Sequence, residues 1–167
     1  MGGSGSGWQG PKKNIVEDCL VLSISDLIRQ RLIVPASYRS GSLEWSYEGA
    51  SEPFARIGYE ADLRNMKSTT LHLQYVCNDK AINQWVWLKH TEPHYGGSRW
   101  WFRCPILQIR VGKLYLPPNE FRFASRKAHK LTYRSCQKSG LLARLCRQMA
   151  RELGLDEANE HHGPNLR

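Results

Sequence analysis

The sequence predicts an α+β fold, in which an antiparallel β-rich domain is followed by a small hairpin and a C-terminal helix. Between residues 43 and 123, short runs rich in aromatic and β-branched residues alternate with runs of turn formers, which is typical of antiparallel strands. Beyond residue 139, leucines and a methionine recur at helical spacing instead. The strands and the helix therefore belong to separate parts of the chain, as in an α+β protein.

Composition divides the 167 residues into four segments. We expect a flexible Gly/Ser-rich basic arm at 1–13, a β-rich domain with a short N-terminal helix at 14–103, a hairpin at 104–138, and a basic helix with a polar tail at 139–167. In the second segment, Ser25 is placed to cap a helix over 26–31. Residues 36–45 resemble a loop that enters a strand, which argues against a helix-turn-helix.

The predicted strands have one apolar and one polar face where their sequence alternates. Leu71, Leu73 and Tyr75 share one side of their strand, which indicates a half-buried antiparallel strand. The strand runs are 43–48, 54–60, 69–77, 82–90, 98–104, 107–116 and 121–125. Beyond them, Ser139 can cap a helix that ends at Gly154 and is apolar along Leu142, Leu145, Met149 and Leu153.

Hydropathy and cysteine usage favour a cytoplasmic protein. The sequence has no run of about 20 apolar residues that would span a membrane, and its start lacks the pattern of a secretory signal. Its five cysteines are widely spaced and form no CxxC pair, which is a poor disulfide framework and suits a reducing compartment. We therefore expect no membrane partner.

The positive charge is concentrated in one part of the chain. Residues 1–98 carry ten Lys/Arg and ten Asp/Glu, whereas residues 99–151 carry thirteen Lys/Arg and one acid, Glu120, a net charge of +12. Such segregation is expected of a surface that binds nucleic acid or another polyanion. The alternative is that folding scatters these charges over all faces of the molecule.

The hairpin segment has the spacing of a metal-binding frame. Structural zinc takes four Cys or His ligands, commonly from two CxxC turns that face each other. A two-residue gap separates Cys104 from Leu107, and the same gap separates Ser125 from Ala128. Only one of these four positions holds a ligand, and Leu107 and Ala128 are apolar, as a metal-free hairpin packed on its neighbour would require. A substitute site from Cys104, His129 and Cys136 with His90 or His94 has no standard spacing, so we expect no metal.

Longer motifs around this frame resemble a known family. The motifs GGSRWWFRCP at 96–105, RVGKLYLPP at 110–118 and LTYRS at 131–135 are similar to those of a family of uncharacterised small proteins from bacterial and mobile-element genomes. Proteins of this family end in a zinc-ribbon-like region, in which the motif CPxC is followed by RVGKLYLP and then by FxCRxCHxLTYRS. The resemblance implies metal cysteines at the four frame positions, of which this chain keeps only Cys104. It therefore implies a degenerate zinc-ribbon-like hairpin.

Candidate binding residues combine aromatic rings with cations. In an extended strand Arg99, Trp101 and Arg103 point to one side, and an indole between guanidinium groups can stack on a base while the cations pair with phosphates. Trp85 and Trp87 would share this face if the two strands pair. The alternative is that the tryptophans belong to the core or lie under the C-terminal helix. The remaining candidate phosphate contacts are Arg122, Arg126, Lys127, Lys130, Arg134, Arg144 and Arg147.

Catalytic motifs are absent from the sequence. The clusters at 90–94 (His, Glu, His) and 160–162 (Glu, His, His) match no metalloprotease, Walker or nucleophile motif. Glu60 and Asp62 would suit a metal-dependent nuclease, but two carboxylates near a strand are common by chance. We therefore expect no enzyme, no catalytic residue and no cofactor.

The function that the sequence predicts is non-catalytic binding of DNA or RNA. The alternative is a phage or mobile-element interaction protein, which would use its positive face to bind and modulate a host protein, a nucleoprotein complex or a CRISPR-like defence effector. The partner is therefore a nucleic acid or a host nucleoprotein.

Overall fold

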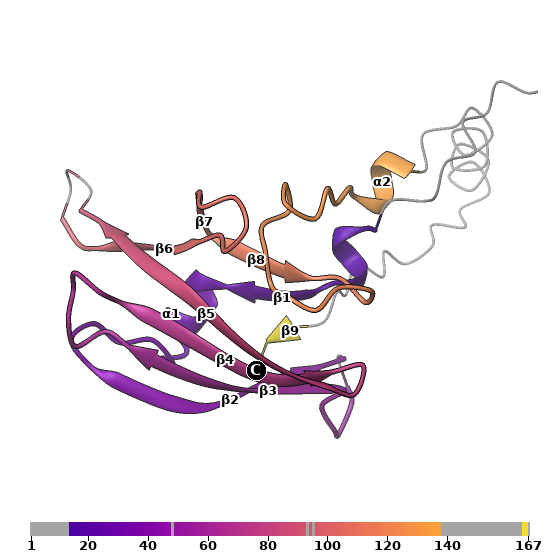
Figure 1. Ribbon diagram of the computed structural model, residues 1–167, viewed down its shortest axis with the longest axis horizontal. Helices are drawn as coiled ribbons and strands as arrows, with labels where there is room; N and C mark the ends of the chain where they lie inside the picture. Colours follow the sequence, from indigo (N-terminus) through magenta and orange to yellow (C-terminus); the bar gives the residue numbers. More distant parts are fainter. Residues whose placement is uncertain (1–13, 48, 93, 95, 138–164, 167) are drawn as a thin grey trace, which may run out of the picture.

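The computed structural model describes residues 14–47, 49–92, 94, 96–137 and 165–166, which are mostly antiparallel β-structure with few helices (Figure 1). Among these residues the larger sheet has seven antiparallel strands in the order β7-β6-β5-β4-β3-β2-β9, in which β2 to β7 form a meander and β9 adds to the β2 edge. Its strands are β2 (Tyr38–Ser46), β3 (Ala55–Asp62), β4 (Thr70–Cys77), β5 (Lys80–Thr91), β6 (Arg99–Arg103), β7 (Arg110–Val111) and β9 (Asn165–Leu166). Figure 1 shows that this sheet is strongly curled.

A second, two-stranded sheet packs against the first. It pairs β1 (Leu20–Ser23) with β8 (Lys113–Leu116) in antiparallel register. The short elements around it are the 3-10 helix η1 (Val16–Asp18), α1 (Ile24–Arg29) and α2 (Arg134–Gln137). The Trp45 indole of β2 donates a hydrogen bond to the Val21 carbonyl of β1 at 3.0 Å, which ties the two sheets together.

The core lies between the two sheets and fills one face of the larger one. Leu22 of β1 and Leu27 of α1 are fully buried with Leu43 and Trp45 of β2 and Phe102 of β6. Because side chains alternate along a strand, the other face of the larger sheet is left outside the core. We call it the outer face.

Gln84 joins the core face of β5 to a loop distant in sequence. Its side-chain oxygen accepts hydrogen bonds from the Phe123 amide at 2.8 Å and from the Tyr75 hydroxyl at 3.0 Å, and its nitrogen donates to the Phe123 carbonyl at 2.7 Å. A buried amide with all these partners is favourable, whereas an unpaired one is costly. This amide therefore anchors the segment that precedes Ser125.

The structure corrects several expected elements. The N-terminal helix exists, but its N-cap is Ser23 and not Ser25. The expected loop at 36–45 is largely strand, because β2 begins at Tyr38 and pairs with all of β3. The expected strand at 107–116 divides at Gly112 into β7 and β8, which join different sheets. In the run 121–125, Ala124 forms only an isolated bridge with Tyr115. The expected helix at 142–153 lies outside the described residues.

Candidate nucleic-acid interface

Strand β6 places the three central candidate residues on the outer face. Trp100 and Phe102 are buried on the core side, at 4% and 0% exposure. Arg99, Trp101 and Arg103 alternate with them and therefore lie on the opposite side, as the sequence predicted. The two arginines are exposed and the indole is half-buried.

The Trp101 ring is held in place by two contacts. The Arg99 guanidinium lies 4.2 Å from the ring centroid, a cation–π contact. The indole nitrogen donates a hydrogen bond to the Thr91 hydroxyl at 3.1 Å. One face of the indole is thus occupied by a cation, and the ring is oriented before any ligand arrives.

The neighbouring strand adds two exposed indoles. Trp85 and Trp87 of β5 are 58% and 46% exposed, so they are not core residues in this structure. They alternate with the buried Val86 and Leu88, and β5 pairs with β6, so both rings lie on the outer face with Trp101. Trp85 stacks on His72 of β4 with ring centroids 4.1 Å apart and planes 7° from parallel. His72 thus lies against one face of the Trp85 ring, while both indoles stay exposed enough to stack with a further ring.

Strand pairing brings in two cations that sequence reasoning missed. Lys89 lies opposite Trp101 in the β5–β6 register, and Arg110 lies opposite Arg103 in the β6–β7 register. Both are exposed. The alternation of its strand already puts Lys89 on the side of Trp85 and Trp87, although it was not a candidate site residue, whereas the position of Arg110 depends on how β7 pairs. Together these residues form what we call the basic–aromatic strip: Trp85, Trp87, Lys89, Arg99, Trp101, Arg103 and Arg110.

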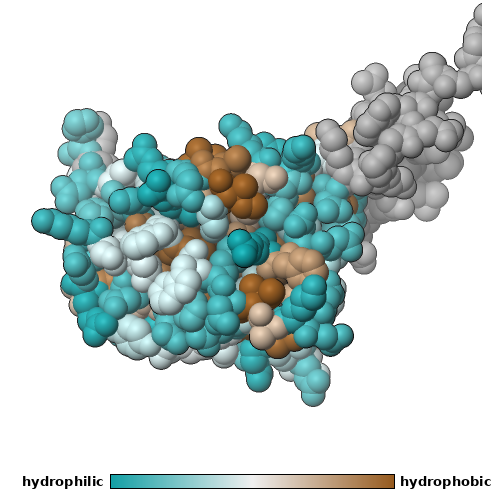
Figure 2. All heavy atoms as spheres, in the orientation of Figure 1, coloured by the Kyte–Doolittle hydropathy of each residue, from teal (hydrophilic) through white to brown (hydrophobic). Residues whose placement is uncertain are grey.

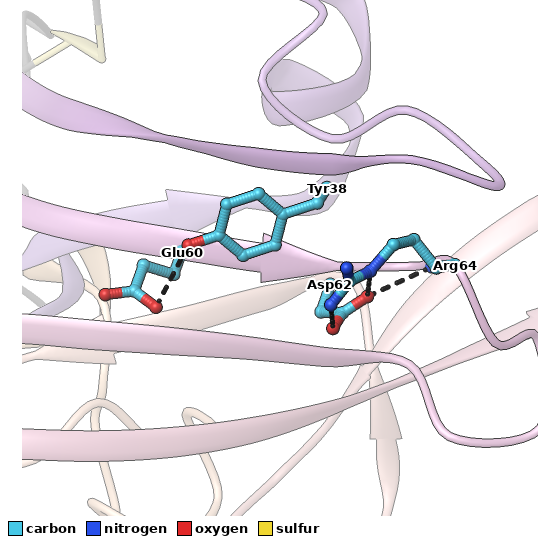
Figure 3. A network of polar contacts seen from close by, with 4 residues as sticks. All are labelled: Tyr38, Glu60, Asp62 and Arg64. Carbon is cyan, nitrogen blue, oxygen red and sulfur yellow. Dashed lines mark hydrogen bonds and ion pairs between the residues drawn. The ribbon is translucent and has the colours of Figure 1, made fainter.

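The other half of the outer face is polar and contains carboxylates. Figure 3 shows that the Tyr38 hydroxyl points to Glu60, to which it donates at 3.2 Å, while Asp62 lies against Arg64. The guanidinium donates to both Asp62 carboxylate oxygens, at 3.0 and 2.7 Å. These hydrogen bonds from Arg64 lower the pKa of Asp62 to about 2. Gln74 donates to Glu60 at 3.2 Å. The two carboxylates that suggested a nuclease are thus engaged by neighbouring side chains.

Two turns with the same hydrogen-bond pattern meet at Cys104 and Ser125. In the first, the Leu107 amide donates to the Cys104 sulfur at 3.5 Å and the Gln108 amide to the Cys104 carbonyl at 2.8 Å. In the second, the Ala128 amide donates to the Ser125 hydroxyl oxygen at 3.2 Å and the next amide to the Ser125 carbonyl at 3.2 Å. Repetition of one turn at both frame positions is the local geometry that a two-knuckle metal site needs.

The centre between the turns is occupied by the protein's own groups. The Cys104 thiol donates to the Ser125 hydroxyl at 3.3 Å and accepts from the Ser125 amide at 3.3 Å. Burial acts to raise the pKa of Cys104, but hydrogen bonds from three neighbouring backbone amides and the contact with the Ser125 hydroxyl hold that pKa below its ordinary value. The buried Cys104 sulfur therefore has several hydrogen-bond partners.

Among the described residues, Cys104 belongs to no cluster of metal-ligand side chains. No group of three or more His, Cys, Asp or Glu that could hold a metal ion occurs in the part of the chain that the structure describes. Leu107, an apolar residue expected in a hairpin packed on its neighbour, is instead 44% exposed. The His129 ring nitrogen instead donates to the Arg122 carbonyl at 3.0 Å.

Four of the remaining candidate cations lie in or close to the second turn, which begins at Ser125. Arg122, Arg126, Lys127 and Lys130 are exposed. Arg134 is different, because its guanidinium pairs with Asp18 at 3.2 Å and its amide donates to the Glu17 carboxylate. Although residues 99–151 contain only one acid, Arg134 is thus paired with two acids from the N-terminal part of the chain. Arg144 and Arg147 lie outside the described residues.

Of the two clusters at 90–94 and 160–162, the structure describes only part of the first. His90 contacts the Trp100 ring with centroids 5.3 Å apart, and residues 160–162 lie outside the described residues.

Hydrophilic residues cover most of the side of the molecule shown in Figure 2, and hydrophobic ones form separate small patches. Within the described ranges, the structure has no helix both long and apolar enough to cross a membrane.

Comparisons with protein-family models, with curated proteins and with solved structures find no match to this chain.

Proposed function

We propose that this protein binds nucleic acid without catalysis, and that the basic–aromatic strip is its contact surface. The observation that carries the proposal is the exposure of Trp85 and Trp87 beside a pre-oriented Trp101 on a strip with four cations. Every base has a face that can stack on an aromatic ring, and cations along the same surface pair with the phosphates. A single-stranded segment, whose bases are free to stack, fits this surface best.

The charges on the sheet favour one path for the bound nucleic acid. The strip carries Lys89, Arg99, Arg103 and Arg110, whereas the carboxylates of Glu60 and Asp62 lie two strands away on β3. Phosphates are attracted to the first group and repelled by the second. The nucleic acid therefore runs along β5 and β6 and does not cross the sheet.

Binding of a labelled single-stranded oligonucleotide over a range of salt concentrations tests the proposal. Four phosphate contacts predict that the logarithm of the affinity falls with the logarithm of salt concentration with a slope of about −3. Arg103→Ala should weaken binding and reduce the slope by about 0.7. Trp87→Ala should weaken binding about tenfold with little change of slope, because it removes a stacking platform and no charge.

Matched controls come from the same chain. Lys67→Ala removes an exposed cation from the β3–β4 connection, and Tyr47→Ala removes an exposed aromatic ring outside the strip. Both should bind as the parent does. Absence of binding at low salt would contradict the proposal and favour the alternative, in which the positive surface contacts an acidic protein.

A further inference from the structure

The turn that joins β6 to β7 exposes apolar side chains at its tip. Ile106, Leu107 and Ile109 are 54%, 44% and 40% exposed, although each is a residue type that is usually buried. All three belong to six consecutive residues, 104–109. An apolar tip this concentrated indicates a contact surface.

This tip is rigid because both of its ends are fixed. The Cys104 amide donates to the Ile109 carbonyl at 2.9 Å and the Gln108 amide to the Cys104 carbonyl at 2.8 Å. The Gln108 side chain also donates to the Pro105 carbonyl at 2.8 Å. Cys104 is held in turn by Ser125 at 3.3 Å. The apolar groups are thus presented at little further cost in conformational entropy on binding.

The tip lies at one end of the basic–aromatic strip. Arg103 is the last residue of β6 and Arg110 the first of β7, they face each other in the register, and the tip connects them. The contact between Cys104 and Ser125 brings the second turn, with the exposed Arg126 and Lys127, beside the first. No acidic residue occurs from Arg99 to Asn119, all of which the structure describes. Cations therefore flank the apolar tip, so the charge around it is complementary to that of a polyanion.

We propose that this tip, Ile106, Leu107 and Ile109, packs on the last base pair at a junction between duplex and single strand while the unpaired strand continues along the strip. The inference rests on the proposed function and adds the form of nucleic acid that is bound. Apolar side chains flanked by cations are the combination that proteins insert against base steps, because the apolar group replaces a stacked base while the cations hold the phosphates. An acidic peptide would not use the stacking platforms that continue from the tip.

Three probes of equal labelled strand length test the inference: a single strand, a blunt duplex, and a duplex with a single-stranded overhang. The parent protein should bind the overhang duplex about tenfold more tightly than the single strand, as expected from burying a few apolar side chains. The double variant Ile106→Ser, Leu107→Ser should lose this preference and keep the parent's affinity for the single strand. 2-Aminopurine in the terminal base pair should brighten with the parent protein and not with the variant.

Two further variants separate contact from folding. Met66→Ser removes an exposed apolar residue from the β3–β4 connection, where it is 38% exposed, and should bind all three probes as the parent does. Leu107→Phe keeps an apolar tip and should retain the preference for the junction.

Equal affinity of the parent for single strand and junction would overturn the inference and leave the proposed function in place. A serine variant that weakens binding to all probes equally would also overturn it, since the tip would then act through the fold. Binding of poly-L-glutamate that depends on Leu107, without a junction preference, would identify an acidic protein as the occupant. Absence of binding to any probe would contradict both proposals.

Discussion

The Cys104 thiol lies 3.3 Å from the Ser125 hydroxyl, at the point where two turns of the same hydrogen-bond pattern face each other. The pair connects the end of β6 to a residue 21 positions later. It closes the base of the apolar tip and positions the cations of the second turn beside it. The contribution of this contact to the free energy of unfolding can be measured by substituting Ser125.

Ser125→Ala should destabilise the fold by about 1 to 3 kcal/mol, because the change leaves the half-buried Ala128 amide and the buried Cys104 thiol without their shared partner. Urea unfolding measures the loss. Ser40→Ala, at an exposed position of β2, should change the free energy of unfolding by less than about 0.5 kcal/mol. Equal effects of the two substitutions would show that the Ser125 hydroxyl has no special role.

Restoring thiols at the other frame positions should create a zinc site. Thiolates that share a tetrahedral zinc ion with Zn–S bonds of about 2.3 Å lie roughly 3.8 Å apart, and the Cys104 sulfur is already 3.3 Å from the Ser125 oxygen. The triple variant Leu107→Cys, Ser125→Cys, Ala128→Cys should bind about one equivalent of zinc and melt at a higher temperature with the metal than without it. Elemental analysis beside the parent protein provides the comparison. No added zinc in the variant would mean that the turns do not form a metal frame.

Gln84→Leu should be among the most destabilising substitutions in the chain, at about 2 to 4 kcal/mol. It removes the three hydrogen bonds to Phe123 and Tyr75 and leaves the buried Phe123 backbone groups unpaired. Urea unfolding measures this loss too. The neighbouring Asn83→Leu, at an exposed position of β5, is the control and should have a small effect.

The carboxyl of Asp62 should titrate near pH 2, because hydrogen bonds from Arg64 hold its pKa to about 2. A pKa depressed in the folded state contributes stability above the unfolded pKa, and this contribution is lost as pH falls through the folded value. NMR titration of the carboxyl measures it directly. Arg64→Ala should return the pKa toward its ordinary value, whereas Lys67→Ala should not change it. An unchanged pKa in Arg64→Ala would contradict the assigned cause.

Local patterns in the sequence were sufficient for some features because strands alternate wherever they pair. The alternation in 98–104 and 82–90 placed Trp101, Trp85 and Trp87 on one side of their strands, and β5 and β6 do pair, from Leu88 to Thr91 of β5. The start of β2 was missed because Ser40, Gly41 and Ser42 have low strand propensity. Pairing with all of β3 overrides that propensity.

The sequence by itself determined the antiparallel strands, the concentration of positive charge after residue 98 and the two equal gaps at Cys104 and Ser125, because each is a property of near neighbours. Only the tertiary structure decided which cations stay free, since η1 brings Asp18 to Arg134 across 116 positions. Register alone set Arg110 opposite Arg103. The exposure of Leu107 likewise depends on what packs around its turn. These features depend on contacts between segments that are distant in the sequence, and no local pattern encodes such contacts.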